Sequence, residues 1–187
     1  NHISSANAST GFNPGHFLLA DPEGLRLLEL DTRKEVQWHL DPDQLSCEYP
    51  IDAVRLPNQH LLVADFQRHQ VYEVGQRGKI YWSLKIFEDE HLRLKEPVRV
   101  TWYRPPGATD EDLRYLIVDQ GNHRVIEVDK SSHVHREFGV QGEAGDDRHH
   151  LQSPGDVQFT PDRTWLICDT ENGRVLEFDE HGRIEQE

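Results

Sequence analysis

One spacing recurs four times along the chain and constrains its fold more than any other feature. In each copy an Asp ends a short apolar run and a Glu follows eight positions later: Asp21 and Glu29, Asp65 and Glu73, Asp119 and Glu127, Asp169 and Glu177. Residues 153–187 show the unit in full, as four β-favouring runs separated by Pro, Gly, Asn and Asp. Self-similarity at a period of several tens of residues indicates a repeat architecture, here of four-stranded antiparallel units.

Strand alternation within a unit predicts that both faces of each sheet are buried. In the third copy it places Val125 and Glu127 on one face and Ile126 and Val128 on the other. Apolar residues on both faces are expected when a sheet is packed between two neighbours. An Asp at a strand end can accept hydrogen bonds from the backbone N–H groups of the following turn. We therefore expect structural turn roles for Asp21, Asp65, Asp119 and Asp169, with the Asn-Gly and Gly-Asn pairs in left-handed conformations.

The first unit has no room for its opening strand. In the other units this strand follows a proline, at Pro50, Pro97 and Pro154. In the first unit Pro14 lies only seven positions before Asp21, which is too close for a strand and a turn. We expect the first unit to be incomplete, or to be completed by another segment or another chain, because an open sheet edge must be covered.

These units resemble the NHL-repeat family of β-propellers. The resemblance is carried by Val118-Asp-Gln-Gly-Asn-His-Arg-Val and by Ile167-Cys-Asp-Thr-Glu-Asn-Gly-Arg-Val-Leu-Glu-Phe-Asp. Unit two is also similar to arylsulfotransferase-like and PQQ-like propeller repeats. The resemblance implies an all-β protein, a β-propeller of four NHL-like four-stranded blades, the first incomplete. The expected bounds are a polar N-terminal segment, 1–14, then a propeller domain, 15–187, with blades at about 15–45, 46–91, 92–139 and 153–187.

Propellers have four to eight blades, and the family usually closes with six. Three assemblies are therefore open: a four-bladed ring, part of a longer propeller, or units that assemble with other chains. The sequence favours four blades in one chain.

The charge balance argues against nucleic-acid partners. The net charge is −14, from 34 acidic and 20 basic residues, and an excess of carboxylates repels a phosphate backbone. RNA binding, known for some NHL proteins, would need a locally basic face. No apolar run approaches the roughly 20 residues of a membrane span. The acidic, lysine-poor composition suggests an extracellular or periplasmic setting.

Positions that differ between copies are better candidates for a binding site than those that repeat. Two positions after the proline of each first strand lie Asp52, Arg99 and Asp156. First strands line the channel of a propeller, so these side chains should converge near one mouth. They could neutralise one another structurally, or hold an anionic or sugar-like ligand.

A metal site is a weaker possibility. His149 and His150 lie beside Asp146 and Asp147, and imidazole and carboxylate groups suit zinc or related ions. No element carries a three-ligand spacing, so a solvated loop is the preferred interpretation. No cofactor is predicted, although Ca or Zn remains possible.

The two cysteines and four tryptophans have structural interpretations. Cys168 lies in an apolar run and is expected to be buried, whereas Cys47 lies in a turn-like stretch and is expected to be exposed. The tryptophans are expected to pack between neighbouring blades rather than to form a sugar platform.

The sequence favours a non-enzymatic propeller that acts as a binding or assembly module for protein or small-ligand partners, including self-association through the first blade. The alternative is a propeller enzyme of hydrolase, lyase or sulfotransferase type with a metal or His at the channel mouth. No Gly-x-Ser-x-Gly element is present, and no catalytic residue is assigned.

Overall fold

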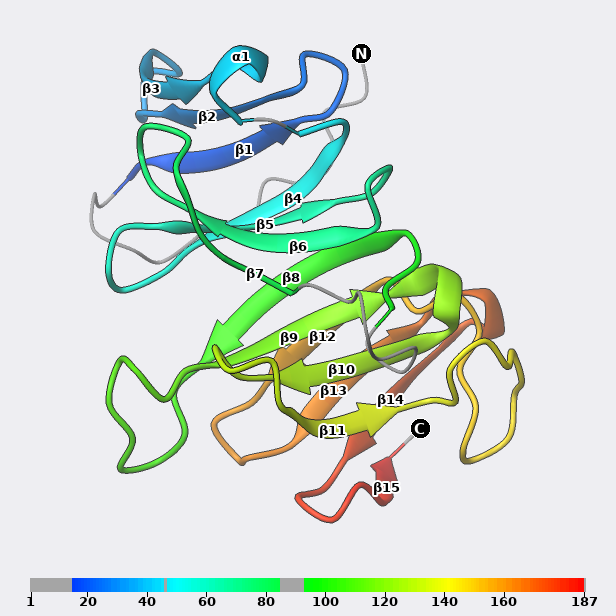
Figure 1. The fold of residues 1–187 in the computed structure, drawn as a ribbon. Helices are drawn as coiled ribbons and strands as arrows, with labels where there is room; N and C mark the ends of the chain where they lie inside the picture. Colours follow the sequence, from blue (N-terminus) through cyan, green and yellow to red (C-terminus); the bar gives the residue numbers. More distant parts are fainter. Residues whose placement is uncertain (1–14, 46, 85–92, 187) are drawn as a thin grey trace.

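The strands of the chain form four antiparallel sheets in strict sequence order (Figure 1). The structure, a computed structural model, describes residues 15–45, 47–84 and 93–186. The predicted segment 1–14 lies outside the described residues. The described part is all-β apart from the short helix α1 (Pro42–Leu45) and two single 3₁₀ turns, η2 (Gln120–Asn122) and η3 (Thr170–Asn172). No helix in the described ranges is both long and apolar enough to span a membrane.

Each sheet corresponds to one repeat unit, and we call it a blade. Blade 1 has three described strands, β1 (Phe17–Asp21), β2 (Arg26–Leu30) and β3 (Val36–Leu40). Blade 2 contains β4 (Pro50–Arg55), β5 (Leu61–Asp65), β6 (Gln70–Val74) and β7 (Ile80–Ser83). Blade 3 contains β8 (Pro97–Tyr103), β9 (Arg114–Asp119), β10 (Arg124–Val128) and β11 (Val134–Phe138). Blade 4 contains β12 (Asp156–Phe159), β13 (Trp165–Asp169), β14 (Arg174–Phe178) and β15 (Ile184–Gln186).

The predicted incomplete first unit is confirmed, because blade 1 is a three-stranded sheet whereas the others have four strands. Its register identifies the strand that it lacks. Asp21 on β1 pairs with Arg26 as Asp119 on β9 pairs with Arg124. Strand β1 is therefore the second strand of the repeat, and the inner first strand is the one absent from the described sheet.

The core consists of three clusters, each between two consecutive blades. We call the face of a blade toward the next blade in sequence its forward face, and the opposite face its rear face. Val125 packs into the cluster shared with blade 4, whereas Ile126 and Val128 pack into the cluster shared with blade 2. All three are fully buried. The predicted burial of both faces is confirmed, and hydrophobic burial between blades holds the units in series.

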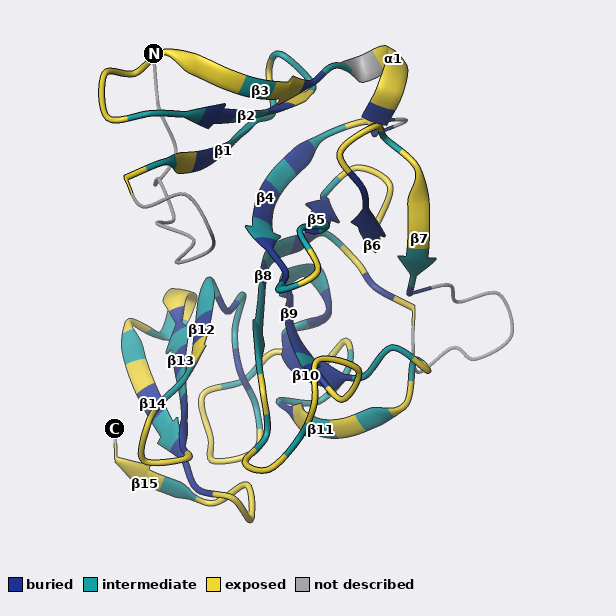
Figure 2. Ribbon diagram, turned by 90° about the vertical axis from the view of Figure 1, so that its left-hand side faces the viewer, coloured by how far each residue is buried: buried dark blue, intermediate teal, exposed yellow. Residues whose placement is uncertain are grey.

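The four blades follow an open arc (Figure 2). Inner strands pack in sequence, β1 on β4, β4 on β8 and β8 on β12. The described strands of blades 1 and 4 share no packing of that extent. Within the described ranges, the outer faces of the first and last blades do not meet, so these residues do not form the closed four-bladed ring that the sequence favours.

The turn after the repeated Asp has the same conformation in every blade. The residue four positions after the Asp has a positive φ in each case: Leu25, His69, His123 and Gly173, with φ of 53°, 54°, 57° and 64°. The sequence assigned the left-handed residue in blade 3 to its Gly-Asn pair, which was wrong by one position. Gly121 is needed there for another reason, because a Cβ on it would lie 2.8 Å from the Lys95 carbonyl oxygen.

Candidate functional site

Three charged side chains from three consecutive inner strands lie in contact along the arc. They are Asp52 on β4, Arg99 on β8 and Asp156 on β12, and we call them the inner charge row. Arg99 Nη1 lies 3.7 Å from Asp52 Oδ1, and Arg99 Nε lies 2.9 Å from Asp156 Oδ1. The structure thus brings the three sequence-predicted candidates together.

A β-bulge sets the position of the row. The pairing of β4 with β5 shifts register between Pro50 and Asp52, and that of β8 with β9 shifts between Pro97 and Arg99. Bulges redirect a side chain at the edge of a sheet. In blade 4 the described pairing of β12 with β13 runs from Asp156 to Phe159 without a shift, so the bulge belongs to blades 2 and 3.

The members of the row differ in how firmly the fold holds them. Asp52 is almost buried, and its Oδ2 accepts a hydrogen bond of 3.0 Å from Val100 N on the next inner strand. Asp156 Oδ1 accepts a 2.9 Å hydrogen bond from Val157 N, and its side chain is 36% exposed. Asp52 therefore also joins two blades, whereas Asp156 is accessible.

The Arg99 guanidinium keeps an unused donor. Its Nε is buried and close to Asp156, but its N–H is not aligned for a hydrogen bond to any acceptor in the described residues. A buried N–H without an acceptor costs free energy. Because this Nε is buried, the row meets solvent mainly through the Asp156 carboxylate, which is 36% exposed, and less through Arg99, which is 17% exposed.

The repeated aspartates lie where the sequence places them, at the ends of β1, β5, β9 and β13. Each carboxylate accepts hydrogen bonds from its own turn, and three of them also hold the chain that enters their own blade. Asp119 Oδ1 accepts from Lys95 N at 2.6 Å, and Asp119 Oδ2 accepts from Asn122 and Arg124, both at 2.8 Å. Asp169 makes the corresponding bonds to Gln152 N, Asn172 and Arg174. Asp65 accepts from Glu48 N and Tyr49 N, whereas Asp21 accepts from Gly24 N and Arg26.

The repeated glutamates form a set of contacts that sequence reasoning did not assign. Each is held by the residue five positions before the repeated Asp: Glu29 by His16, Glu73 by His60, Glu127 by Arg114 and Glu177 by Thr164. The distances run from 2.6 Å for His60 to 3.6 Å for Arg114. The changing residue type at that position hid the relationship, although its constant spacing was available in the sequence.

In blades 1 and 2, the repeated glutamate also contacts a basic residue of the blade that follows in sequence. Arg55 Nη2 lies 2.6 Å from Glu29 Oε2, and Lys130 Nζ lies 3.3 Å from Glu73 Oε2. Burial opposes ionisation of Glu73, but hydrogen bonds from Asn58 and His60 outweigh it and lower the pKa of this carboxyl. Glu29 and Glu73 therefore link blades 1 and 2 to the blade that follows each of them.

The loop with the weak metal candidates is tied together by Asp147. Its Oδ1 accepts hydrogen bonds from the backbone N–H groups of His149 and His150 and from His150 Nδ1. The bond from His149 N, followed by that from the His150 ring, lowers the pKa of Asp147 to about 2. The hydrogen bond with the Asp147 carboxylate in turn raises the pKa of His150. Asp146 contributes its carbonyl oxygen to Arg174. Across the described ranges, no three His, Cys, Asp or Glu side chains are grouped as a metal site would require.

Both cysteine expectations were wrong. Cys47 is buried, and burial together with the neighbouring Asp65 carboxylate raises the pKa of its thiol to about 12. Cys168 is only half-buried. The reason lies in the blade order: Cys168 is on the forward face of blade 4, which no further described blade covers.

All four tryptophans lie between blades. Trp38 Nε1 donates to Gln76 O, and Trp102 Nε1 donates to Arg55 O. The ring of Trp82 lies 5.2 Å from that of Tyr115, and Arg136 lies 4.4 Å above the Trp165 ring. These contacts bury large rings at each junction of the arc.

Comparisons with known proteins identify the fold. No protein-family model and no curated protein matches the chain. Virginiamycin B lyase from Staphylococcus aureus aligns with a TM-score of 0.62 and 12% identity, over 96% of this chain and 53% of that one. A protein of unknown function from Bacteroides caccae gives 0.63 and 15%, over 93% and 63%. An auxiliary nutrient binding protein from Bacteroides thetaiotaomicron gives 0.57 and 17%, over 86% and 44%.

These structures are β-propellers, so this chain has a β-propeller fold. It spans about half of the length of the lyase that it matches. At sequence identities below 20%, this structural similarity establishes the fold and not the activity.

Proposed function

We propose that this chain is a non-enzymatic, NHL-type propeller module that binds a small polyhydroxylated ligand, such as a sugar, at the inner charge row. The observation that carries the proposal is the contact between Asp52, Arg99 and Asp156, at one repeat position of three successive blades. Positions that repeat unchanged serve the fold, whereas this position alternates in charge and stays partly accessible.

The chemistry of the row favours hydroxyl groups over anions. A hydroxyl both donates and accepts hydrogen bonds, so it can bridge a carboxylate and a guanidinium. The row has one positive and two negative side chains, and an anionic ligand would be repelled by its two carboxylates. A polyol has the alternating donors and acceptors that this row requires.

Titration calorimetry with a panel of neutral mono- and disaccharides tests this function. Asp156→Asn keeps the shape of the side chain and removes its charge, and we expect affinity to fall about 10-fold with loss of one charge-assisted hydrogen bond. Asp162→Asn, an exposed acidic residue in the β12–β13 turn, is the matched control and should bind as the unchanged protein does. Equal affinities of the two variants, or no binding by the unchanged protein, would contradict the proposal.

Metal analysis of the purified protein addresses the enzyme alternative. Stoichiometric zinc or calcium that is lost in Asp52→Ala or Asp156→Ala would favour a metal-dependent propeller enzyme over the non-enzymatic binding module.

We further propose an extracellular or periplasmic location, which the acidic, lysine-poor composition supports. Detection of the protein in cell fractions tests that location.

A further inference from the structure

The turn that joins the last two strands of a blade has the same backbone hydrogen bonds in all four blades. In blade 2, Gly75 N donates to Lys79 O at 2.9 Å, and Gly78 N donates to Gly75 O at 2.9 Å. The corresponding two bonds in the other blades start from Asp31, Asp129 and Asp179, with lengths of 2.9–3.2 Å. The backbone groups of this turn are therefore arranged alike in every blade.

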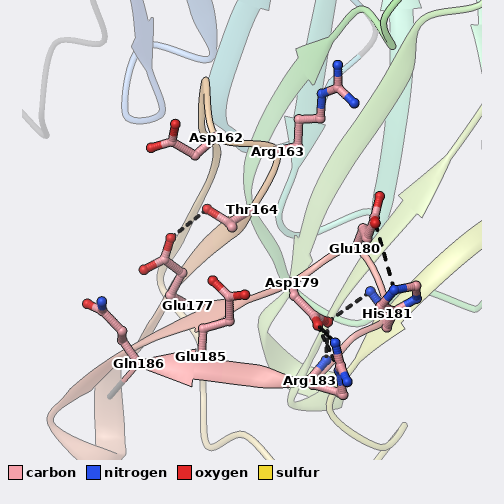
Figure 3. Close-up of a pocket in the computed structure, with 10 residues that line it drawn as sticks. All are labelled: Asp162, Arg163, Thr164, Glu177, Asp179, Glu180, His181, Arg183, Glu185 and Gln186. Atoms are coloured by element: carbon pink, nitrogen blue, oxygen red, sulfur yellow. Dashed lines mark hydrogen bonds and ion pairs between the residues drawn. The ribbon is translucent and has the colours of Figure 1, made fainter.

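In blades 1, 3 and 4 the first residue of the turn is an Asp whose carboxylate closes it. Asp179 Oδ1 accepts hydrogen bonds from the backbone N–H groups of His181 and Arg183, both at 2.8 Å (Figure 3). Asp31 Oδ1 and Asp129 Oδ1 accept from the equivalent N–H groups at 2.8–3.1 Å. Burial opposes ionisation of Asp179, but hydrogen bonds from Arg183 and His181 outweigh it and lower the pKa of this carboxyl. The turn thus stabilises a carboxylate.

Blade 2 has Gly75 at this position, so its turn has no such carboxylate. The equivalent N–H groups belong to Arg77 and Lys79, and neither has a hydrogen-bond acceptor among the described residues. Because the backbone of the turn is the same, these two N–H groups converge on one place as they do in the other blades. Convergent backbone N–H groups bind anions.

A pocket of about 560 Å³ at this turn is basic. Its charged side chains are Arg77, Lys79 and, when protonated, His60, and no Asp or Glu is among the described residues that line it. Glu73, the partner of His60, has a side chain only 3% exposed and also pairs with Lys130, so its charge is already balanced. This pocket is a local exception in a chain with a net charge of −14.

His60 and Tyr81 form the wall of the pocket opposite the chain of the turn. His60 Nδ1 lies 2.6 Å from Glu73 Oε1, which orients the ring, and its Nε2 has no hydrogen-bond partner in the described ranges. The rings of His60 and Tyr81 are stacked with centroids 4.1 Å apart, and Lys79 Nζ lies 4.8 Å from the Tyr81 centroid. Gly75 lets Tyr81 lie here, because a Cβ on it would be 2.8 Å from Tyr81 Cε2.

We propose that this pocket of blade 2 binds a small organic acid. One carboxylate of the ligand takes, at the Arg77 and Lys79 N–H groups, the place that the Asp carboxylate has in the other three blades. A second carboxylate meets the side-chain cations of the same two residues, so dicarboxylic acids fit better than monocarboxylic acids. The inference is independent of the inner charge row, since none of the three residues of that row lines this pocket.

Amide NMR spectra of the protein titrated with succinate test the site. We expect the Arg77 and Lys79 amide protons to shift downfield in a saturable way. The Ser131 and His133 amide protons, which Asp129 already holds, should stay unchanged. Succinamide has a similar shape without the charge and should cause no such shift. Absence of a saturable shift at the two blade 2 amides, or an equal shift with succinamide, would overturn the proposal.

Two replacements of Gly75 separate the carboxylate from the added Cβ. Gly75→Asp supplies the carboxylate from the chain itself and should weaken succinate binding by at least about 10-fold. Gly75→Ala adds the same Cβ against Tyr81 without a carboxylate, and should change the affinity by less than about 3-fold. Equal affinities of the two variants would contradict the site.

A pair of exposed arginines provides a second test that does not alter the turn backbone. Arg77→Gln should weaken succinate binding by about 3-fold or more, because a cation of the pocket is lost. Arg33→Gln makes the same change at the equivalent position of blade 1, where Asp31 closes the turn, and should bind as the unchanged protein does. An effect of the same size in both variants would mean that the net charge of the chain, and not this pocket, attracts the acid.

Discussion

The four repeated aspartates occupy one position but differ in burial, and burial decides what each contributes. Asp119 is fully buried, and its partner Arg124 is 1% exposed. Asp21 and Arg26 form the same ion pair, but their side chains are 31% and 46% exposed. A buried charge that loses its partner is costly, whereas an exposed pair contributes little because solvent screens it.

Replacement of the two aspartates measures this difference. Asp119→Asn removes the buried counter-charge of Arg124 and leaves it with Glu137, 3.3 Å from its Nη1, whose side chain is 36% exposed. We expect a loss of about 3–5 kcal/mol in unfolding free energy. Asp21→Asn is the matched control in blade 1, with an expected loss below about 1 kcal/mol. Urea denaturation of both variants gives the comparison. Similar losses would show that the turn geometry, and not the buried charge, sets the energetic role of this position.

At the scale of elements, we compare the turn that joins the last two strands of each blade, β2–β3, β6–β7, β10–β11 and β14–β15. Its conformation is the same in all blades, but its contacts with neighbouring segments differ. The same position has a positive φ in all four blades: Lys34, Gly78, Ser132 and Gly182, with φ of 66°, 80°, 65° and 74°. Two of the four residues are not glycine, so a side chain is tolerated at modest strain. Gly78 differs, because a Cβ on it would lie within van der Waals overlap of the Gln44 carbonyl oxygen in α1.

The contrast between two glycines tests whether α1 packs against this turn. Gly182→Ala meets no atom within 4 Å, and we expect it to cost about 1 kcal/mol of backbone strain. Gly78→Ala adds a clash with backbone and should cost about 2–4 kcal/mol. Thermal or urea unfolding distinguishes the two. If Gly78→Ala were as mild as Gly182→Ala, α1 would not be held against the turn.

Strand elements and their faces were predictable from the sequence because every copy repeats the same alternation and the same Asp–Glu spacing. Details that depend on a neighbouring blade were not. The sequence placed Cys168 in the core from its apolar context, but burial there requires a fifth blade. It placed Cys47 at the surface because it could not show that the link to blade 2 folds back over Tyr72 and Asp65.

The candidate site was predictable in its members and not in its geometry. Asp52, Arg99 and Asp156 were found because they break the repeat at one position. The order of contacts along the row depends on register shifts in β4 and β8, which no single strand pattern encodes. The contacts of the repeated glutamates within their own blades were missed because the partner varies in type, from His to Arg to Thr.

At the scale of the whole molecule, the arc explains why equivalent residues have unequal environments. The residue six positions after the repeated Asp always faces the next blade, so its burial reports whether that blade is present. Val125 is fully buried against blade 4, whereas Val175 is half exposed. Serial stacking of independent sheets is therefore the claim on which both the fold and the inner charge row depend.

The unfolding free energies of Val125→Ala and Val175→Ala, measured at a dilution where sedimentation shows single chains, test that claim most directly. We expect Val125→Ala to lose about 2–3 kcal/mol from buried methyl groups and the cavity they leave. Val175→Ala should lose less than about 1 kcal/mol. Equal losses at the two positions would contradict the serial stacking of blades.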